Sequence, residues 1–161
     1  MTTRNPAPSP RSMDLQALPG HNIRRLQQIA VALFMQESAG DGVTPVQFAV
    51  LHTLAAQAGI DQRTLAQQVS FDTSTIGGVI DRLEARGLLT RNHSPGDRRV
   101  RLLHLTPEGQ ALLAGLMPSM QRAQRRVLEP LSAAERKLFM GLMQRVIAHH
   151  EVAGRAGDAG D

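Results

Sequence analysis

The sequence predicts a mainly α-helical protein: a winged helix-turn-helix with a small β-hairpin wing, flanked by long helices at both ends. Three observations lead to this class. Apolar residues recur at three- and four-residue steps over most of the 161 residues, which is typical of helices. Two short helical segments in the middle are each preceded by an Asp and lie three or four residues apart, as in a helix-turn-helix. A hairpin pattern follows the second segment directly.

Composition limits what the protein can do. Hydrophobic residues make up 42% and charged residues 20%, so we expect a folded globular body. Cysteine is absent, which excludes a disulfide framework, a thiolate metal site and a thiol redox sensor. No apolar run approaches the ~20 residues of a membrane helix, and the Pro-rich start lacks the apolar segment of a signal peptide. We therefore expect a cytoplasmic protein that does not enter a membrane.

The first part of the chain contains two predicted helices. Residues 1–18 are rich in Pro, Ser and Thr and are predicted to form a flexible arm. A helical apolar stripe covers His21–Ser38, and a glycine-rich segment ends it. Thr44 and Pro45 begin the second helix, because Thr is a good N-cap and Pro suits the first turn; this helix ends at Gly59.

The middle of the chain contains the helix pair and the hairpin. Asp61 and Asp72 are predicted N-caps, and the first helix of the pair ends near Val69. After the second helix, the apolar runs 88–93 and 99–105 are joined by Ser-Pro-Gly-Asp, a sequence typical of turns. This hairpin is the predicted wing.

Two further helices follow the wing. A Thr-Pro pair at 106–107 begins the first, and Ser132 with Glu135 forms a capping box for the last. Residues 151–161 are predicted to form a flexible tail. A winged helix alone needs roughly 70 to 90 residues, and the surplus helices predict dimerisation. The predicted organisation is one domain at 19–150, with the winged helix-turn-helix at about 44–105 and dimerisation helices at about 19–40 and 106–150.

The helix after Asp72 is the candidate recognition helix. Its first turn carries three hydroxyls, on Thr73, Ser74 and Thr75, which suit contacts to phosphates and base edges in a DNA major groove. The alternative is that these residues only cap the helix. The wing that follows favours DNA binding.

The basic charge of the chain is concentrated on the predicted wing. Segment 86–101 holds five arginines and one acid, so its net charge of +4 equals that of the whole chain. Arginine suits a narrow minor groove, and Asp97 is placed to orient the Arg99 guanidinium. The alternative is a solvated, charged hairpin, and the preceding helix pair favours DNA. The five arginines are Arg86, Arg91, Arg98, Arg99 and Arg101.

Two clusters suggest enzyme chemistry without suitable geometry. His93, Ser94 and Asp97 are the residue types of a hydrolytic triad, but a turn at a wing tip offers neither an enclosed pocket nor an oxyanion hole. His149 and His150 could begin a metal site, but adjacent residues on a helix do not share a face. We therefore predict no enzyme activity, no catalytic residue, no metal site and no cofactor.

Polar and aromatic residues on the first two helices suggest a pocket for a small molecule. Histidine and arginine at the start of the first helix can bind a carboxylate, and the few phenylalanines are rings that a planar ligand could contact. The alternatives are a satisfied, partly buried histidine and ion pairs across a dimer. The candidates are His21, Arg24, Arg25, Phe34, Phe48 and His52.

The segment Leu65–Leu113 resembles the MarR family of bacterial winged-helix regulators. Its most specific motifs are DRLEARGLLTR at 81–91 and DRRVRLLHLTPEG at 97–109, and looser similarity extends from about 21 to 150. The start GHNIRRLQQIAVALF, at 20–34, is similar to a subgroup often associated with aromatic-acid breakdown.

The resemblance implies a homodimeric repressor that binds a pseudo-palindromic, double-stranded DNA operator and is released by a small phenolic or aromatic carboxylate. The alternative is a winged-helix module for DNA or protein contact without an effector. Gly77 and Gly78 stand where many members carry larger polar residues, which shifts base recognition to the first turn of the recognition helix. The wing charge and the resemblance together give these DNA-binding candidates: Gln62, Arg63, Thr73, Ser74, Thr75, Arg82, Arg91, Asp97, Arg98 and Arg99.

Overall fold

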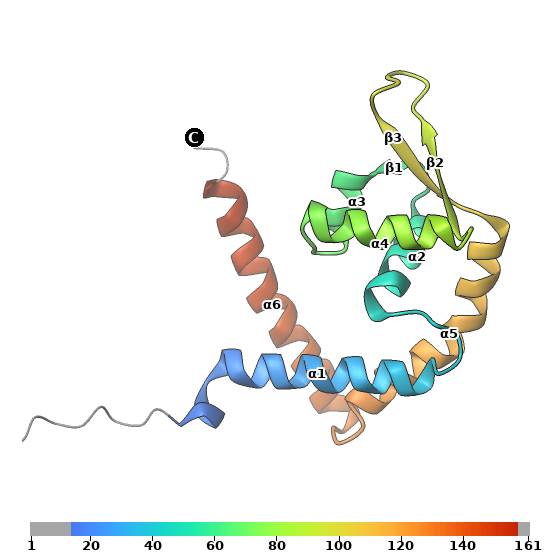
Figure 1. Ribbon diagram of the computed structural model, residues 1–161. Coiled ribbons are helices and arrows are strands. Elements are labelled where there is room, and N and C mark those ends of the chain that lie inside the picture. The colour runs from blue at the N-terminus through green and yellow to red at the C-terminus, as the bar shows by residue number, and fades with distance from the viewer. Residues whose placement is uncertain (1–13, 158–161) are drawn as a thin grey trace, which may run out of the picture.

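Helices and one small sheet make up the computed structural model, which describes residues 14–157 (Figure 1). Residues 1–13 and 158–161, which include most of the predicted arm and part of the predicted tail, lie outside the described residues. The elements follow in the order η1 (a 3₁₀ helix) Leu15–Ala17, α1 Pro19–Glu37, α2 Pro45–Ala56, β1 Ile60–Asp61, α3 Gln62–Gln68, α4 Thr73–Ala85, β2 Leu89–His93, β3 Arg101–Leu105, α5 Pro107–Val127 and α6 Ala133–Gly157.

Side chains cap the helices at the positions that the sequence predicts. The Thr44 hydroxyl accepts a hydrogen bond from the Gln47 amide, and the Gln47 side chain accepts one from the Thr44 amide. This reciprocal pair satisfies two backbone groups that a helix start leaves without partners. Four later helices also begin with a side chain that accepts from a backbone amide three residues on, and at Ser132 the bond is again reciprocal, through Glu135; these caps are Asp61, Asp72, Thr106 and Ser132.

The winged lobe, made of α2, α3, α4 and a three-stranded antiparallel sheet, confirms the predicted fold class. The strand order is β1-β3-β2, with Leu89 opposite Leu105 and Ile60 opposite Leu103. The two-residue strand β1 was not expected, because two residues are too short to show an alternating pattern. The core of the lobe is aliphatic; its largest fully buried side chains include Leu51, Leu54, Leu65, Ile76, Ile80, Leu83, Leu89 and Leu103.

Helix α5 begins against the base of the wing. The Thr106 amide and hydroxyl donate to the carbonyl oxygens of Leu88 and Gly87, at 3.2 and 2.7 Å. A side chain at Gly109 is impossible without movement, because its Cβ would lie 2.0 Å from the Leu88 carbonyl oxygen. Glycine at 109 therefore lets α5 touch the wing backbone.

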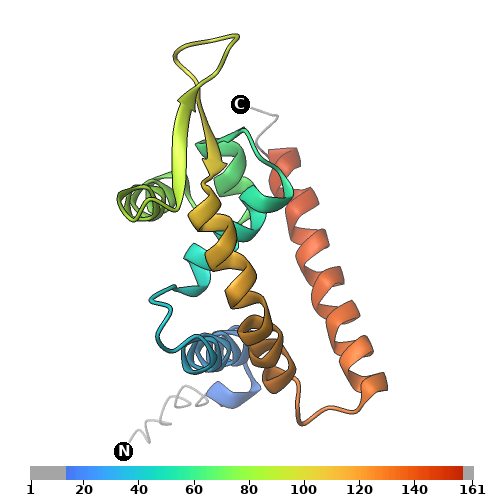
Figure 2. The same ribbon diagram turned by 90° about the vertical axis from the view of Figure 1, so that its right-hand side faces the viewer.

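The long helices lie below and beside the lobe. Helix α1 packs along α5, while α6 leaves the end of α5 and runs apart from the lobe (Figures 1 and 2). Two boundaries differ from the prediction. Residues 15–17, expected in a flexible arm, form the 3₁₀ helix η1, which Asp14 caps. Helix α6 continues to Gly157 rather than ending near 150.

Candidate nucleic-acid interface

The tip of the wing is ordered by its own backbone and polar side chains. The Asp97 carboxylate accepts a hydrogen bond from the Arg99 amide at 2.9 Å, so it braces the backbone of Arg99 and not, as expected, its guanidinium. His93 Nδ1 lies 2.8 Å from the Arg98 carbonyl oxygen, and the Ser94 hydroxyl accepts from the Gly96 amide at 3.4 Å. His93, Ser94 and Asp97, the residue types of a hydrolytic triad, therefore stabilise the turn instead.

The five arginines of segment 86–101 divide into two groups. Arg91 pairs with Asp81 and Glu84 of α4, and Arg86 donates to the carbonyl oxygens of Gly42 and Asp41 at 2.8 and 3.3 Å. These two guanidiniums bind the protein itself. Arg91, a predicted DNA contact, thus already has its charge paired with two carboxylates of α4.

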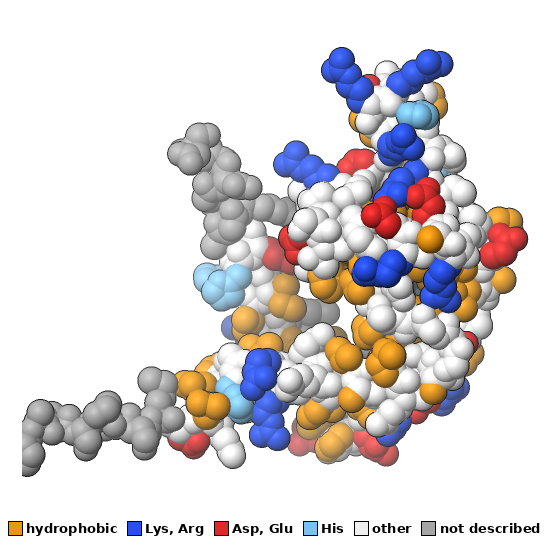
Figure 3. Space-filling model, viewed as in Figure 1, with side chains coloured by type: hydrophobic (Ala, Val, Ile, Leu, Met, Phe, Trp, Pro, Cys, Tyr) orange, Lys and Arg blue, Asp and Glu red, His pale blue; other side chains and the backbone are white. Residues whose placement is uncertain are grey.

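The remaining three arginines are available to a partner. Arg98, Arg99 and Arg101 are exposed, and within residues 14–157 their side chains form no hydrogen bond or ion pair. Figure 3 shows basic side chains at the tip of the wing, on the same side of the molecule as α4. Free positive charge therefore gathers at the far end of the hairpin.

The first turn of α4 holds its hydroxyls in one orientation. Ser74 and Thr75 donate their hydroxyl hydrogens to the two oxygens of the Asp72 carboxylate, at 2.5 and 2.6 Å. These bonds and the Thr75 amide hold the pKa of Asp72 well below its usual range. An ionised carboxylate accepts only, so both hydroxyls present acceptor oxygens to their surroundings. Thr73 is exposed and keeps a hydroxyl without such a bond among the described residues.

Three residues beside this turn differ in what they can contact. Arg63 of α3 and Arg82 of α4 are exposed, which suits phosphate contact. Gln62, also a DNA-binding candidate, instead donates its side-chain amide to the Thr73 carbonyl oxygen at 3.0 Å. Sequence patterns cannot reveal this bond, because it joins two helices whose relative placement depends on the whole lobe.

The six ligand-binding candidates do not meet in one protomer. Phe34 and Phe48 are buried core residues whose rings pack edge to face, 5.9 Å apart. His52 is exposed and stacks on Phe48 at 5.7 Å. His21 lies thirteen residues before Phe34 on the same helix, a separation of about 20 Å at the α-helical rise per residue. Arg24 and Arg25 belong to the distant end with His21, so a pocket built from all six is wrong for a single chain.

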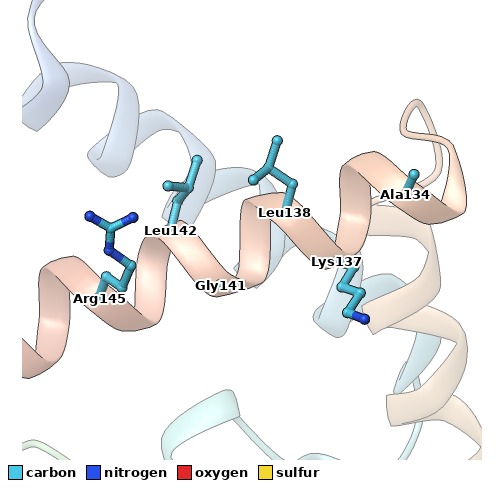
Figure 4. Close-up of a pocket in the computed structure, with 6 residues that line it drawn as sticks. All are labelled: Ala134, Lys137, Leu138, Gly141, Leu142 and Arg145. Atoms are coloured by element: carbon cyan, nitrogen blue, oxygen red, sulfur yellow. The ribbon is translucent and has the colours of Figure 1, made fainter.

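Two cavities lie where the long helices expose apolar side chains. One, of about 430 Å³, lies between α1, α5 and α6. The other, of about 470 Å³, follows one face of α6 (Figure 4). The same three- and four-residue periodicity that predicts these helices could have identified the residues as a continuous apolar surface. The α6 face is lined by Ala134, Lys137, Leu138, Gly141, Leu142 and Arg145.

Comparison with known proteins decides the family. A sequence model of the MarR family matches residues 43–100, which run from the start of the winged lobe to the wing tip. The HTH-type transcriptional repressor NicR of Pseudomonas putida is 32% identical over 95% of this chain and 98% of its own length. The chain belongs to the MarR family. The resemblance of residues 65–113 to this family, noted from the sequence, is thus confirmed.

Solved structures of relatives match this MarR-family protein over nearly their whole length. The PcaV transcriptional regulator from Streptomyces coelicolor, in complex with its natural ligand, aligns with a TM-score of 0.80 at 40% identity, covering 85% of this chain and 96% of that one. Bordetella bronchiseptica BpsR, whose DNA binding is regulated by 6-hydroxynicotinic acid, aligns with a TM-score of 0.75 at 35% identity, covering 79% and 96%. The similarity therefore includes the long helices as well as the lobe.

The described part of this MarR-family protein contains neither a membrane-spanning helix nor a cluster of metal ligands. No helix there is long and apolar enough to cross a membrane. No group of three His, Asp or Glu side chains in residues 14–157 is arranged to hold a metal ion. His149 and His150 pack edge to face with ring centres 5.1 Å apart.

Proposed function

We propose that this MarR-family protein is a cytoplasmic, homodimeric transcriptional repressor that binds a pseudo-palindromic DNA operator. One observation carries the proposal: the wing tip exposes three arginines without a side-chain partner among residues 14–157, and the first turn of α4 exposes its hydroxyl-bearing residues. A helix in the major groove with an arginine-bearing wing beside it uses both kinds of DNA contact, to base edges and to a narrow minor groove.

The orientation of the hydroxyls on α4 predicts which bases are recognised. The Ser74 and Thr75 hydroxyls donate their hydrogens to Asp72, so toward DNA they can only accept hydrogen bonds. In the major groove the donors are the exocyclic amino groups of adenine and cytosine. Phosphate oxygens offer no hydrogen to accept, so we assign these two side chains to base contact. We assign Thr73, Arg63, Arg82, Arg98 and Arg99 to the remaining DNA contacts, with Asp97 bracing the wing tip.

The dimer follows from the long helices. Leu138 and Val146 of α6 are 63% and 57% exposed, and Ile23 of α1 is 65% exposed. Large apolar side chains that are this exposed on two neighbouring helices are typical of a surface that a partner covers. We propose that a second copy covers them and places two recognition helices about 34 Å apart, one turn of DNA.

DNA binding can be tested without knowing the operator. Selection from a pool of random double-stranded DNA with the full-length protein should enrich a site with two related half-sites. Replacing adenine at the enriched positions by purine, which lacks the amino group, should weaken binding by the wild type and have no effect on the double variant Ser74→Ala/Thr75→Val. A pool that yields no enriched sequence would overturn the proposal.

We further propose that a small aromatic carboxylate or phenol releases the DNA, in a role that includes control of aromatic-acid breakdown. The DNA binding of BpsR is regulated by 6-hydroxynicotinic acid, an aromatic carboxylic acid, which supports this class of effector. PcaV was crystallised with a natural ligand, which supports an effector in general. Because the candidates fall into two groups about 20 Å apart, we place the carboxylate near His21 and Arg24 and the ring in the apolar space that dimerisation closes. His52, beside an open cavity of about 390 Å³ between α2 and α5, is the second choice.

The effector hypothesis competes with a module that has no effector. A panel of aromatic acids that includes 6-hydroxynicotinate should contain a compound that raises the melting temperature and lowers operator affinity, because a ligand specific for the folded state stabilises it. Arg24→Ala should blunt this response, whereas the control Arg125→Ala should keep it. No thermal shift with any compound would favour the module without an effector.

A further inference from the structure

A single side chain joins the starts of the two helices of the helix-turn-helix. Gln62 is the first residue of α3, and its amide nitrogen Nε2 donates to the carbonyl oxygen of Thr73, the first residue of α4, at 3.0 Å. The bond therefore connects the helix that precedes the turn directly to the first turn of the recognition helix.

The Gln62 end of this bond is fixed. Asp61, the residue before it, pairs with Leu102 of β3 and also caps α3, accepting from the amide and hydroxyl of Thr64 at 3.0 and 2.8 Å. Gln62 is thus attached to the sheet that carries the wing. Helix α4 is also joined to the sheet further along its length, where Arg91 of β2 pairs with Asp81 and Glu84. The Gln62 bond adds a link at the first turn of α4.

Glycine at 77 leaves the space that this bond occupies. In an α-helix the carbonyl oxygen of residue 73 faces the amide of residue 77, one turn later. A Cβ on Gly77 would lie 3.1 Å from Gln62 Nε2, whereas a Cβ on Gly78 would lie 3.6 Å from Arg82, an ordinary contact. Gly77 is not among the residues with positive φ, so backbone conformation does not require glycine there.

We propose that Gln62 is a positioning residue for the recognition helix, and that residue 77 is glycine because a side chain would displace the Gln62 amide from Thr73. This inference rests on the proposed DNA-binding function. Gln62, predicted from the sequence as a DNA-binding residue, would thus act on DNA through the recognition helix. It also explains a glycine in the middle of a helix, where glycine lowers helix stability.

A set of five variants tests this pair against the neighbouring glycine. Gln62→Met keeps the length of the side chain and removes the donor. Gly77→Ala adds a Cβ 3.1 Å from Gln62 Nε2, so the amide must move away from it. The double variant Gln62→Met/Gly77→Ala completes the cycle. Gly78→Ala, alone and with Gln62→Met, is the matched control on the same helix. Each protein is titrated with the selected operator and with a random-sequence duplex at one salt concentration.

We expect Gln62→Met and Gly77→Ala each to weaken operator binding about five-fold, the size expected from one hydrogen bond, with unchanged affinity for the random duplex. The double variant should bind no more weakly than Gln62→Met alone, because both changes remove the same bond. Equal losses on both duplexes would instead identify Gln62 as a phosphate contact. Losses that multiply to about 25-fold, or an unchanged Gln62→Met, would also overturn the inference.

Failure of the proposed function can be separated from failure of this inference. If no duplex is enriched by selection, DNA binding itself is wrong, and amide hydrogen exchange of the free protein decides the role of Gln62. Gln62→Met and Gly77→Ala should each speed exchange in the first turn of α4, whereas Gly78→Ala should slow it. Equal exchange in the wild type and Gln62→Met would refute the positioning role.

Discussion

The winged lobe buries its apolar side chains within one chain, whereas helix α6 leaves many of its own exposed. In the lobe, Leu51, Ile76 and Leu83 are fully enclosed by other residues of the same chain. Helix α6 is longer than any helix of the lobe, yet it touches little of the chain, and Leu138, Val146 and Ile147 are each more than half exposed. The lobe is therefore complete within one chain, whereas α6 has an apolar surface that the chain does not cover.

This difference separates two kinds of residue that look alike in the sequence. A leucine in α4 stabilises the lobe by leaving water, because about 25 cal/mol is gained for each Å² of apolar surface buried. A leucine in α6 gains this only when another surface arrives. The arginines divide in the same way: Arg91 is neutralised within the lobe, and Arg99 is not.

Placing charge on the α6 surface should have the largest effect on function. The double variant Leu138→Asp/Leu142→Asp should be monomeric at micromolar concentration, because carboxylates resist burial in an apolar interface. Operator affinity should fall by about 10²–10⁴-fold, since each half-site then binds alone. Sedimentation velocity measures the first result and a DNA titration measures the second.

The control for this variant is Gln144→Asp, which adds one charge at an exposed polar position of α6. It should remain dimeric. The melting of the lobe in the double variant should stay cooperative, because its core does not include either leucine. A double variant that still sediments as a dimer would show that α6 is not the pairing surface, and the comparison between the two regions would fail.

The sequence predicts the fold well because the helix starts are encoded locally. Thr44, Asp61, Asp72 and Thr106 each cap a helix that begins within one residue of its expected position. What the sequence does not predict depends on contacts between distant segments. Strand β1 exists because Ile60 lies opposite Leu103, more than forty residues away.

The candidate interface was less predictable than the fold. Charge counting placed five arginines near DNA, but it could not show which guanidiniums already had partners. Arg91 faces Asp81 and Glu84 only because β2 folds back across α4. The ligand-binding candidates are a different case: His21 and Phe34 are thirteen residues apart on α1, so the helical rise alone already separates them by about 20 Å.

A methyl group at Gly109, where α5 meets the lobe, should be the most damaging single change for stability. Gly109→Ala places a Cβ 2.0 Å from the Leu88 carbonyl oxygen, a backbone atom that cannot move without disturbing the wing. We expect a loss of roughly 3 kcal/mol in unfolding free energy, the upper end for overpacking. Gly115→Ala, on the same helix in open space, should instead stabilise the protein by up to about 1 kcal/mol through helix propensity. Urea denaturation compares the two variants, and equal stabilities would show that the close approach of α5 to the wing is not a constraint.

Two arginines of the wing test the difference between bound and free charge. Arg99→Ala should weaken operator binding about ten-fold and lower the slope of log affinity against log salt by about one or less, because a counterion-releasing contact is lost. Arg91→Ala should leave that slope unchanged and reduce stability by about 1 kcal/mol or less, since its ion pairs are partly exposed. Titrations at four salt concentrations measure both slopes. A reduced slope for Arg91→Ala would return this residue to the DNA interface.

The smallest predicted effect concerns acid stability, and it arises both in the lobe and at the contact between α1 and α5. Hydrogen bonds from Ser74 and Thr75 lower the pKa of Asp72 in the lobe, and hydrogen bonds from Arg122 and Arg126 lower the pKa of Glu37, which joins α1 to α5. A carboxyl group whose pKa is lower in the folded state stabilises that state above its unfolded pKa, about 4, and loses this contribution as the pH falls toward the folded value. The gap in melting temperature between the wild type and Asp72→Ala should therefore be constant from pH 7 to about pH 5 and narrow below pH 4. Glu37→Gln should show the same narrowing, and because Asp72 is lower still, its gap should persist to more acidic pH. A gap that stays constant down to pH 2 in both variants would contradict the assignment of these carboxylates as ionised, hydrogen-bonded groups in the folded protein.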